Sequence, residues 1–132
     1  VFQAYNLINT LTALENVALP LRLSGIPRSE RLEYAYELLT KVGLQDRVYH
    51  KPTQLSGGQQ QRIAIARALA NDPPVILADE PTGNLDTASG ENVMEMLREL
   101  NENGRTIMVV THDPRMTKYA SRVIKMLDGH LL

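Results

Sequence analysis

The sequence predicts an α/β fold in which a helical region is followed by part of a parallel sheet. The first half of the chain carries apolar residues at helical spacing, whereas the second half alternates short apolar runs with helical patterns. Strands that alternate with helices are typical of a parallel sheet core. We expect three parts: residues 1–10 as an entry segment, 11–72 as an α-helical subdomain and 73–132 as part of the α/β core.

Two helices are expected in the first third of the chain. Thr12 and Glu15 have the spacing of a capping box, so a helix should begin after Thr12. Pro20 should end or kink that helix, because proline lacks the N–H that continues it. Ser29 is the expected N-cap of a second helix, and Gly43 is its expected end.

A third helix is expected after a loop. Ser56 and Gln59 form a second capping box, and Ile63, Ala66 and Leu69 follow at helical spacing. After this helix, the apolar residues no longer follow helical spacing and occur in short runs that are typical of strands.

Two short apolar runs, 75–78 and 107–110, are expected to be buried strands, and 123–127 is expected to be a third strand. The turn at Asp128 and Gly129 should close the last one. Between the first two strands we expect a helix that begins at Asp86 as N-cap and ends at Gly104.

A short helix should begin at Asp113 and Pro114, since proline at the first helical position loses no needed N–H. No repeat, linker or low-complexity segment interrupts the 132 residues.

Composition excludes several classes of protein. A net charge of −1 gives no electrostatic footprint for nucleic acid, and the absence of cysteine excludes disulfides and thiolate metal sites. No apolar run approaches the about 20 residues that span a bilayer. The chain opens with Val1 and Phe2 without a signal peptide, and both of its ends look cut.

Two carboxylates follow the first expected strand. Asp79 and Glu80 would lie at the carboxyl edge of the sheet, where α/β proteins bind ligands. One acid can hold Mg²⁺ while its neighbour orients a water, which is what phosphoryl transfer requires. The alternative is that both acids only cap the following turn.

The residues Ser56, Gly57, Gly58 and Gln59 form a glycine-rich helix start. Two glycines allow a close approach of backbone or phosphate, and the N–H groups of the helix favour an anion. An ordinary glycine-rich helix start would explain the glycines but not the whole string from 55 to 62.

His112 ends the second expected strand, so it should lie on the same edge as Asp79 and Glu80. His50 and His130 are interpreted as structural or exposed. Gln3, taken without context, would be a surface glutamine.

Five motifs in order give the chain a family resemblance. Residues 55–62 resemble the signature motif of ABC transporter ATPases, and 75–80 resemble the Walker B strand with its catalytic glutamate. Residues 84–86 resemble the D-loop, His112 the switch histidine and Gln3 the Q-loop glutamine. The resemblance implies a P-loop NTPase fold of the ABC ATPase type, N-terminally truncated.

The resemblance also implies catalytic and metal roles. Asp79 would support Mg²⁺, Glu80 would polarise the attacking water, and His112 would contact the γ-phosphate of ATP. Gln3 would touch Mg²⁺, nucleotide and water while sensing the membrane subunit.

The resemblance also implies that residues 56–59 and Asp86 contact nucleotide. Ser56, Gly57, Gly58 and Gln59 would bind ATP held by the partner subunit, in a head-to-tail homodimer, and Asp86 would add a further nucleotide contact. No Gly-x-x-x-x-Gly-Lys-Ser/Thr string occurs, so we expect these 132 residues to lack the phosphate-cradling loop and to be inactive alone.

Residues 2–7 and 11–21 are similar to the lipoprotein-release and macrolide-efflux group of these ATPases. That implies transmembrane permease partners and a cytoplasmic, peripheral place on the inner face of the membrane. Two alternatives stay open: a soluble, ribosome-associated ABC ATPase, and an interaction module without activity.

Overall fold

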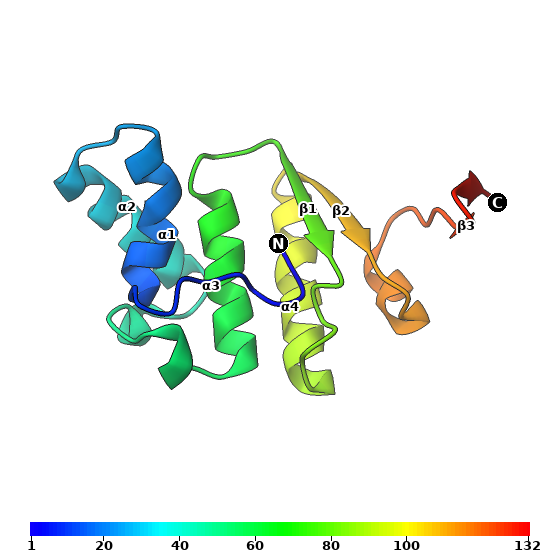
Figure 1. Ribbon diagram of the computed structural model, residues 1–132. Coiled ribbons are helices and arrows are strands. Elements are labelled where there is room, and N and C mark those ends of the chain that lie inside the picture. The colour runs from blue at the N-terminus through cyan, green and yellow to red at the C-terminus, as the bar shows by residue number, and fades with distance from the viewer.

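The computed structural model describes residues 1–132 as a row of layers (Figure 1). Three helices come first, followed by two strands with a fourth helix, and a small hairpin ends the chain. Single-turn 3-10 helices lie at 45–47 and 52–54, and a longer one, η3, at Pro114–Tyr119. The other elements are α1 Ala13–Leu23, α2 Arg28–Lys41, α3 Gly57–Leu69, β1 Val75–Asp79, α4 Thr87–Glu102, β2 Thr106–Val110, β3 Met126–Leu127 and β4 His130–Leu131.

The helices α1, α2 and α3 pack against one another and form most of the core. Their shared interior consists of aliphatic side chains, and Val17, Leu39, Ile63 and Ile65 are fully buried. Such burial is the main favourable contribution to folding. No helix is both long enough and apolar enough to span a membrane.

The helix starts confirm most of the expected caps. Thr12 with Glu15 and Ser56 with Gln59 form complete capping boxes. The prediction for Ser29 is wrong: α2 begins at Arg28, with Pro27 in the N-cap position and no side-chain cap. Proline suits a helix entry because its φ is already near the helical value.

Pro20 does not end α1, which continues to Leu23. The last turn keeps its hydrogen bonding, because Ser24 N donates to Pro20 O at 3.0 Å. Leu21 is only 6% exposed, so packing of this turn against the core offsets the missing proline N–H. The other helix ends follow the sequence, and α2 is terminated by Gly43 in the left-handed region at φ +74°.

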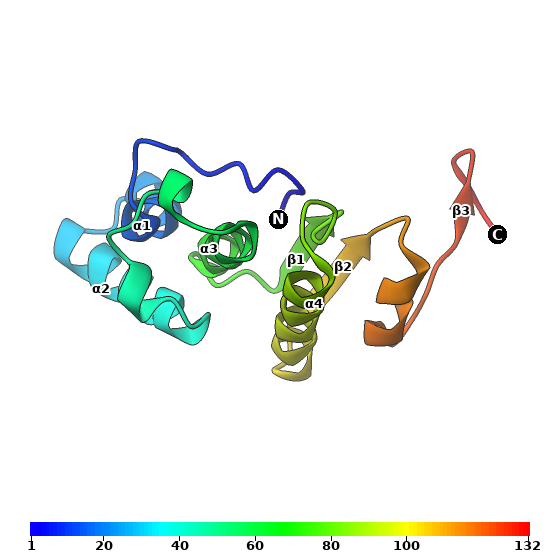
Figure 2. The same cartoon turned by 90° about the horizontal axis from the view of Figure 1, so that it is seen from below.

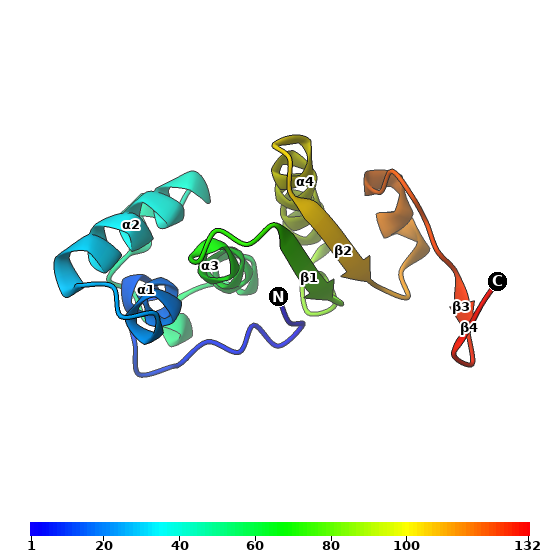
Figure 3. The same cartoon turned by 90° about the horizontal axis from the view of Figure 1, so that it is seen from above.

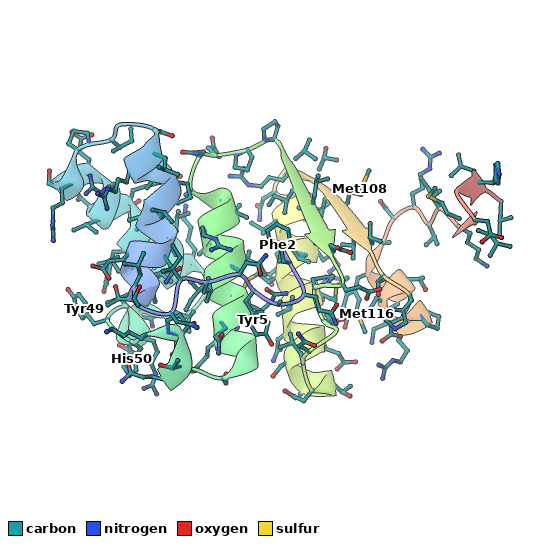
Figure 4. The ribbon with its side chains drawn as sticks, viewed as in Figure 1. Phe2, Tyr5, Tyr49, His50, Met108 and Met116 are labelled. Carbon is teal, nitrogen blue, oxygen red and sulfur yellow. The ribbon has the colours of Figure 1, made fainter.

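β1 and β2 form the predicted parallel pair, in a register that joins Val75 to Thr106 and Asp79 to Val110. α4 covers one face of the pair, where Ile76 is buried (Figures 2 and 3). The expectation that both strands are buried on both faces is wrong. On the face opposite α4, Val75, Leu77, Met108 and Val110 are each about half exposed or more, and Figure 4 shows Met108 beside β2 on this side of the chain.

The other edge of β1 is joined by the first residue of the chain. Val1 N donates to Leu77 O at 2.7 Å, and Asp79 N donates to Val1 O at 3.0 Å. This alternation is the hydrogen-bond pattern of a parallel pair. The N-terminal segment therefore begins at the sheet and then runs across α3 (Figure 1).

The expected third parallel strand over 123–127 is wrong. Met126 and Leu127 instead pair antiparallel with Leu131 and His130, in a hairpin apart from the main sheet. Asp128 and Gly129 are both left-handed, as a two-residue hairpin turn requires. That predicted turn is therefore confirmed, and it gives the strand a local partner. The short helix at Asp113 and Pro114 is confirmed as η3.

Candidate functional site

The carboxyl ends of β1 and β2 bring Glu80 and His112 together, as the sequence predicted. The register pairs Asp79 with Val110, so the residues that follow each strand are neighbours. The Oε1 atom of Glu80 lies 2.6 Å from His112 Nδ1 and accepts from His112 N at 2.8 Å. Thr111 Oγ1 donates to Glu80 Oε2 at 2.9 Å, so three groups fix both oxygens of the carboxylate.

Glu80 also has an unusual backbone, with a φ of +43°. Its N–H donates to Val110 O at 2.8 Å, and Gly83 N donates to its carbonyl at 3.0 Å. A left-handed residue with a side chain is uncommon and persists where its surroundings hold it. The turn therefore directs the Glu80 carboxylate toward the end of β2.

The contact between Glu80 and His112 favours the charged form of both side chains. Burial raises the pKa of Glu80, but the hydrogen bonds from His112 and Thr111 outweigh it and bring the pKa below its ordinary value. The hydrogen bond to Glu80 raises the pKa of His112. Glu80 is thus an oriented, ionised carboxylate whose oxygens can accept a hydrogen bond from a water.

Asp79 is the last residue of β1 and lies on the face of the sheet that α4 does not cover. No group of three or more acidic or histidine residues is gathered here that could hold a metal ion alone. Mg²⁺ is commonly held by one or two carboxylates together with substrate phosphates. Asp79 is a carboxylate of that kind and the amide oxygen of Gln3 is a further oxygen donor on the same segment as Val1, which pairs with β1. The residues present therefore fit Mg²⁺ that is held jointly with nucleotide phosphates.

The start of α3 forms a second group of candidate residues. Ser56 Oγ accepts from Gln59 N at 3.2 Å, and Gln59 Oε1 accepts from Ser56 N at 3.0 Å. A Cβ at Gly57 would lie 2.7 Å from the Tyr5 hydroxyl and 3.2 Å from Leu85, so a side chain there would displace Tyr5. A Cβ at Gly58 would lie 3.1 Å from Ser89 Oγ, a milder crowding. The start of α3 therefore leaves little room for side chains at the two glycines.

A hollow of about 270 Å³ opens beside this helix start. Its lining combines the glycine-rich string with two arginines and one aspartate, so its charge is positive by one and favours an anion weakly. The polar and glycine residues of this lining are Gly43, Asp46, Arg47, Ser56, Gly58, Gln59, Arg62 and Ser89.

Asp86 is found where the sequence placed it, as the N-cap of α4. Its carboxylate accepts from Ser89 N at 3.1 Å, and the hydrogen bonds to Ser89 lower its pKa. Of the other two histidines, His50 lies 3.4 Å from Arg47 and His130 pairs within the terminal hairpin. Neither of them contacts Glu80.

Gln3 contacts the turn that follows Glu80. Asn84 Nδ2 donates to Gln3 O at 3.1 Å, and Gln3 Nε2 donates to Asn84 Oδ1 at 3.4 Å. A Cβ at Gly83 would overlap the Gln3 amide. Asn84 and Gly83 thus join Gln3 to the turn that follows Glu80. Tyr5, labelled in Figure 4, lies against Gly57 and within 3.5 Å of Asn84 O.

Several supporting residues escaped prediction from sequence. Thr111 could have been found, because it precedes His112 at the same strand end. Gln61 and Arg67 bond only to backbone carbonyls of distant segments, and no spacing in the sequence signals such contacts.

Comparison with known proteins agrees with this arrangement. The ABC transporter family matches residues 1–83. An uncharacterised ABC transporter ATP-binding protein of Thermotoga maritima is 58% identical over 99% of this chain and 56% of its own length. The macrolide export ATP-binding/permease protein MacB of Aggregatibacter actinomycetemcomitans is 58% identical over 100% of this chain and 20% of its own.

A solved structure supports the same assignment. The ATP-binding cassette MJ0796, in a dimeric post-hydrolysis state bound to ADP and Pi, superimposes with a TM-score of 0.83 at 50% identity. The alignment covers 98% of this chain and 59% of that cassette. The chain thus spans between a fifth and three-fifths of the lengths of these proteins. The chain belongs to the ABC transporter family and has the α/β fold of the ATP-binding cassettes of that family. Its similarity to MacB confirms the predicted resemblance to macrolide-efflux ATPases.

Proposed function

We propose that the complete protein is the ATP-hydrolysing subunit of an ABC transporter. The observation that carries this proposal is the Glu80 carboxylate, which Thr111 and His112 hold in one orientation at the carboxyl edge of β1 and β2. A fixed, ionised carboxylate at this edge can orient a water for attack on a phosphate.

The proposed roles of the edge residues are those that the resemblance to ABC ATPases implies. Glu80 polarises the attacking water, and His112 contacts the γ-phosphate of ATP. Asp79 and Gln3 supply oxygen atoms toward Mg²⁺, which neutralises phosphate charge when it is bound. Asp86 positions the start of α4 next to the nucleotide.

The start of α3 serves a different nucleotide. Ser56, Gly57, Gly58 and Gln59 bind the ATP held by the partner subunit, so the active assembly is a head-to-tail homodimer. The support for this is the side-chain-free backbone at both glycines, together with the dimer seen for MJ0796. Helix N–H groups and nearby arginines stabilise the phosphate charge.

ATP-driven dimerisation moves transmembrane permease subunits, so the protein works at the cytoplasmic face of a membrane. The name of MacB, which joins an ATP-binding part to a permease, supports this coupling. A soluble ABC ATPase would instead show the same turnover with no response to a membrane partner.

Replacement of Glu80 tests the proposal. In the complete protein, Glu80→Gln keeps the shape of the side chain and removes its charge. We expect turnover to fall by about 10²–10⁴-fold, with ATP binding retained and an ATP-bound dimer trapped. Turnover near that of the wild type would refute the role of Glu80.

Residues 1–132 alone should bind Mg-ATP weakly and hydrolyse none. Most ground-state affinity of P-loop proteins comes from a glycine-rich loop and its lysine, and that string does not occur in this sequence. Calorimetric titration of the 132-residue chain with Mg-ATP measures this. Micromolar affinity would contradict the expectation.

A further inference from the structure

The segment that carries Gln3 bends in an unusual way just after it. Tyr5 and Asn6 are consecutive and both left-handed, with φ values of +60° and +52°. A residue with a side chain rarely adopts this region, and Tyr does so less readily than Asn. Two such residues in a row require a partner that holds them.

Backbone bonds from Tyr5 N to Phe2 O at 3.2 Å and from Asn6 N to Ala4 O at 2.6 Å close the bend locally, and Arg67 of α3 is its side-chain partner. Its Nη1 donates to Asn6 O at 2.6 Å and its Nη2 donates to Tyr5 O at 2.9 Å. One planar guanidinium thus reaches both carbonyls of the bend, which a lysine ammonium cannot match in geometry. Arg67 forms no salt bridge, so these two carbonyls are its hydrogen-bond partners in the chain.

The bend determines where the neighbouring side chains lie. On one side of it, Gln3 packs on Gly83 and exchanges hydrogen bonds with Asn84. At the bend itself, the Tyr5 hydroxyl lies against Gly57 and within 3.5 Å of Asn84 O. A bend that relaxed to extended backbone would move Gln3 and Tyr5 away from both groups of site residues.

We propose that Arg67 is a positioning residue for Gln3: it holds the left-handed bend at Tyr5 and Asn6, and so keeps the Gln3 amide beside the turn that follows Glu80. This inference rests on the proposed function of Gln3 and Glu80. Arg67 itself touches neither nucleotide nor metal. Its loss should therefore reduce the rate of the chemical step more than the binding of ATP.

The experiment compares variants of the complete protein in steady-state ATP hydrolysis. Arg67→Met removes both hydrogen bonds and keeps an apolar stem in the same space. We expect kcat to fall on the order of 10-fold to 100-fold, because small misplacements of catalytic groups have effects of this size. The KM for ATP should change little. Arg67→Lys, which keeps the charge and tests the case where Arg67→Met folds poorly, should lie between that variant and the wild type.

A matched control and a rescue separate positioning from general stability. Arg98→Met replaces an exposed arginine of α4 whose salt bridges are with Glu95 and Glu102, and it should leave kcat unchanged. Asn6→Gly added to Arg67→Met should restore part of the lost kcat, since glycine adopts the left-handed bend without strain. Glycine would not restore kcat if Arg67 only stabilised the fold.

Hydrogen exchange of the amides of residues 4–8 gives a readout that needs no hydrolysis. Arg67→Met should speed this exchange, and Arg98→Met should not. Wild-type kcat in Arg67→Met, or lowered kcat without faster exchange and without rescue by Asn6→Gly, would overturn the inference. If Glu80→Gln retained turnover, the proposed function would fail, while the exchange measurement would still decide whether Arg67 holds the bend.

Discussion

The helical region, α1 to α3, and the strand region, β1, β2 and α4, differ in how completely they are packed. In the helical region, aliphatic side chains such as Leu39 and Ile63 are fully buried from all sides. In the strand region, α4 covers one face of the sheet, and Leu77 and Met108 are 61% and 57% exposed on the other. The first region is held by its own contacts, and the second offers an uncovered apolar face.

Polar residues show the same difference. Asn16 is fully buried in the helical region, and its amide donates to the carbonyls of Ile8, Leu11 and Thr12 while its oxygen accepts from Ile8 N. In the strand region the polar groups Glu80 and His112 meet at an edge that solvent reaches. The polar group of the helical region is thus enclosed and fully bonded, whereas the Glu80 carboxylate lies at a boundary with solvent.

The largest expected effect contrasts two leucines. In the 132-residue chain, Leu39→Ala should lower the free energy of unfolding by about 2–5 kcal/mol, because it leaves a cavity in a packed interior. Leu77→Ala should change it by less than about 0.5 kcal/mol, because that side chain is already exposed. Urea denaturation of both variants measures the contrast. Equal losses would show that the two regions do not differ in packing.

Asn16→Ala should cause the next largest loss in the free energy of unfolding. It removes an amide with four hydrogen bonds and leaves Ile8 N and Leu11 O, which are partly buried, without that partner, at a total cost of about 1–3 kcal/mol. Asn103→Ala is the control, since Asn103 is exposed and makes one bond, to Glu99 O. A stability of Asn16→Ala close to that of the control would mean that water replaces these bonds.

The uncovered sheet face should cause residues 1–132 to self-associate at high concentration. Apolar sheet surface and unpaired edges favour pairing between chains. Leu77→Lys with Met108→Lys places two charges on this face and should return the chain to a monomer. Sedimentation velocity measures both. A monomeric unsubstituted chain would rule out the effect.

The smallest expected effect concerns the Glu80 and His112 pair. The pKa of His112 is raised above its ordinary 6.5, so its share of the pair's stability is complete below pH 6.5 and is lost as pH rises through the raised pKa. The pKa of Glu80 is lowered from 4.5, so its share is present above that pH and is lost as pH falls through the lowered pKa.

NMR titration of the His112 ring tests this pair. In Glu80→Gln the pKa of His112 should fall toward its ordinary value, because the carboxylate that favours the imidazolium is gone. His130, which lies in the terminal hairpin, serves as the internal control. An unchanged His112 pKa would mean that the contact does not persist in solution.

Local sequence signals predicted much of the fold, and distant contacts account for the rest. The capping boxes at Thr12 and Ser56 depend on residues three apart, so spacing reveals them. Pro20 does not end its helix, because burial of the next residue, Leu21, outweighs a missing hydrogen bond. The last strand was misassigned because its partner is the residue pair after the turn and not the main sheet.

The contacts of the candidate site also divide into those that the sequence predicts and those that it does not. That Glu80 and His112 would meet follows from two strand ends in one parallel sheet. The contacts of Gln61 and Arg67 could not be predicted, because each bonds to carbonyls more than fifty positions away in the segment 2–6. The division into parts at 1–10, 11–72 and 73–132 stays a prediction.

Mixing two inactive variants of the complete protein tests whether the two regions serve different nucleotides. Glu80→Gln disables the sheet edge and leaves the start of α3 intact, whereas Gly57→Asp places a carboxylate against phosphate and leaves the edge intact. In a head-to-tail dimer of one variant with the other, one site combines an intact edge with an intact helix start. ATP hydrolysis should therefore reappear in the mixture, well above that of either variant alone. A mixture as inactive as its components would contradict the assignment of the two groups to opposite subunits.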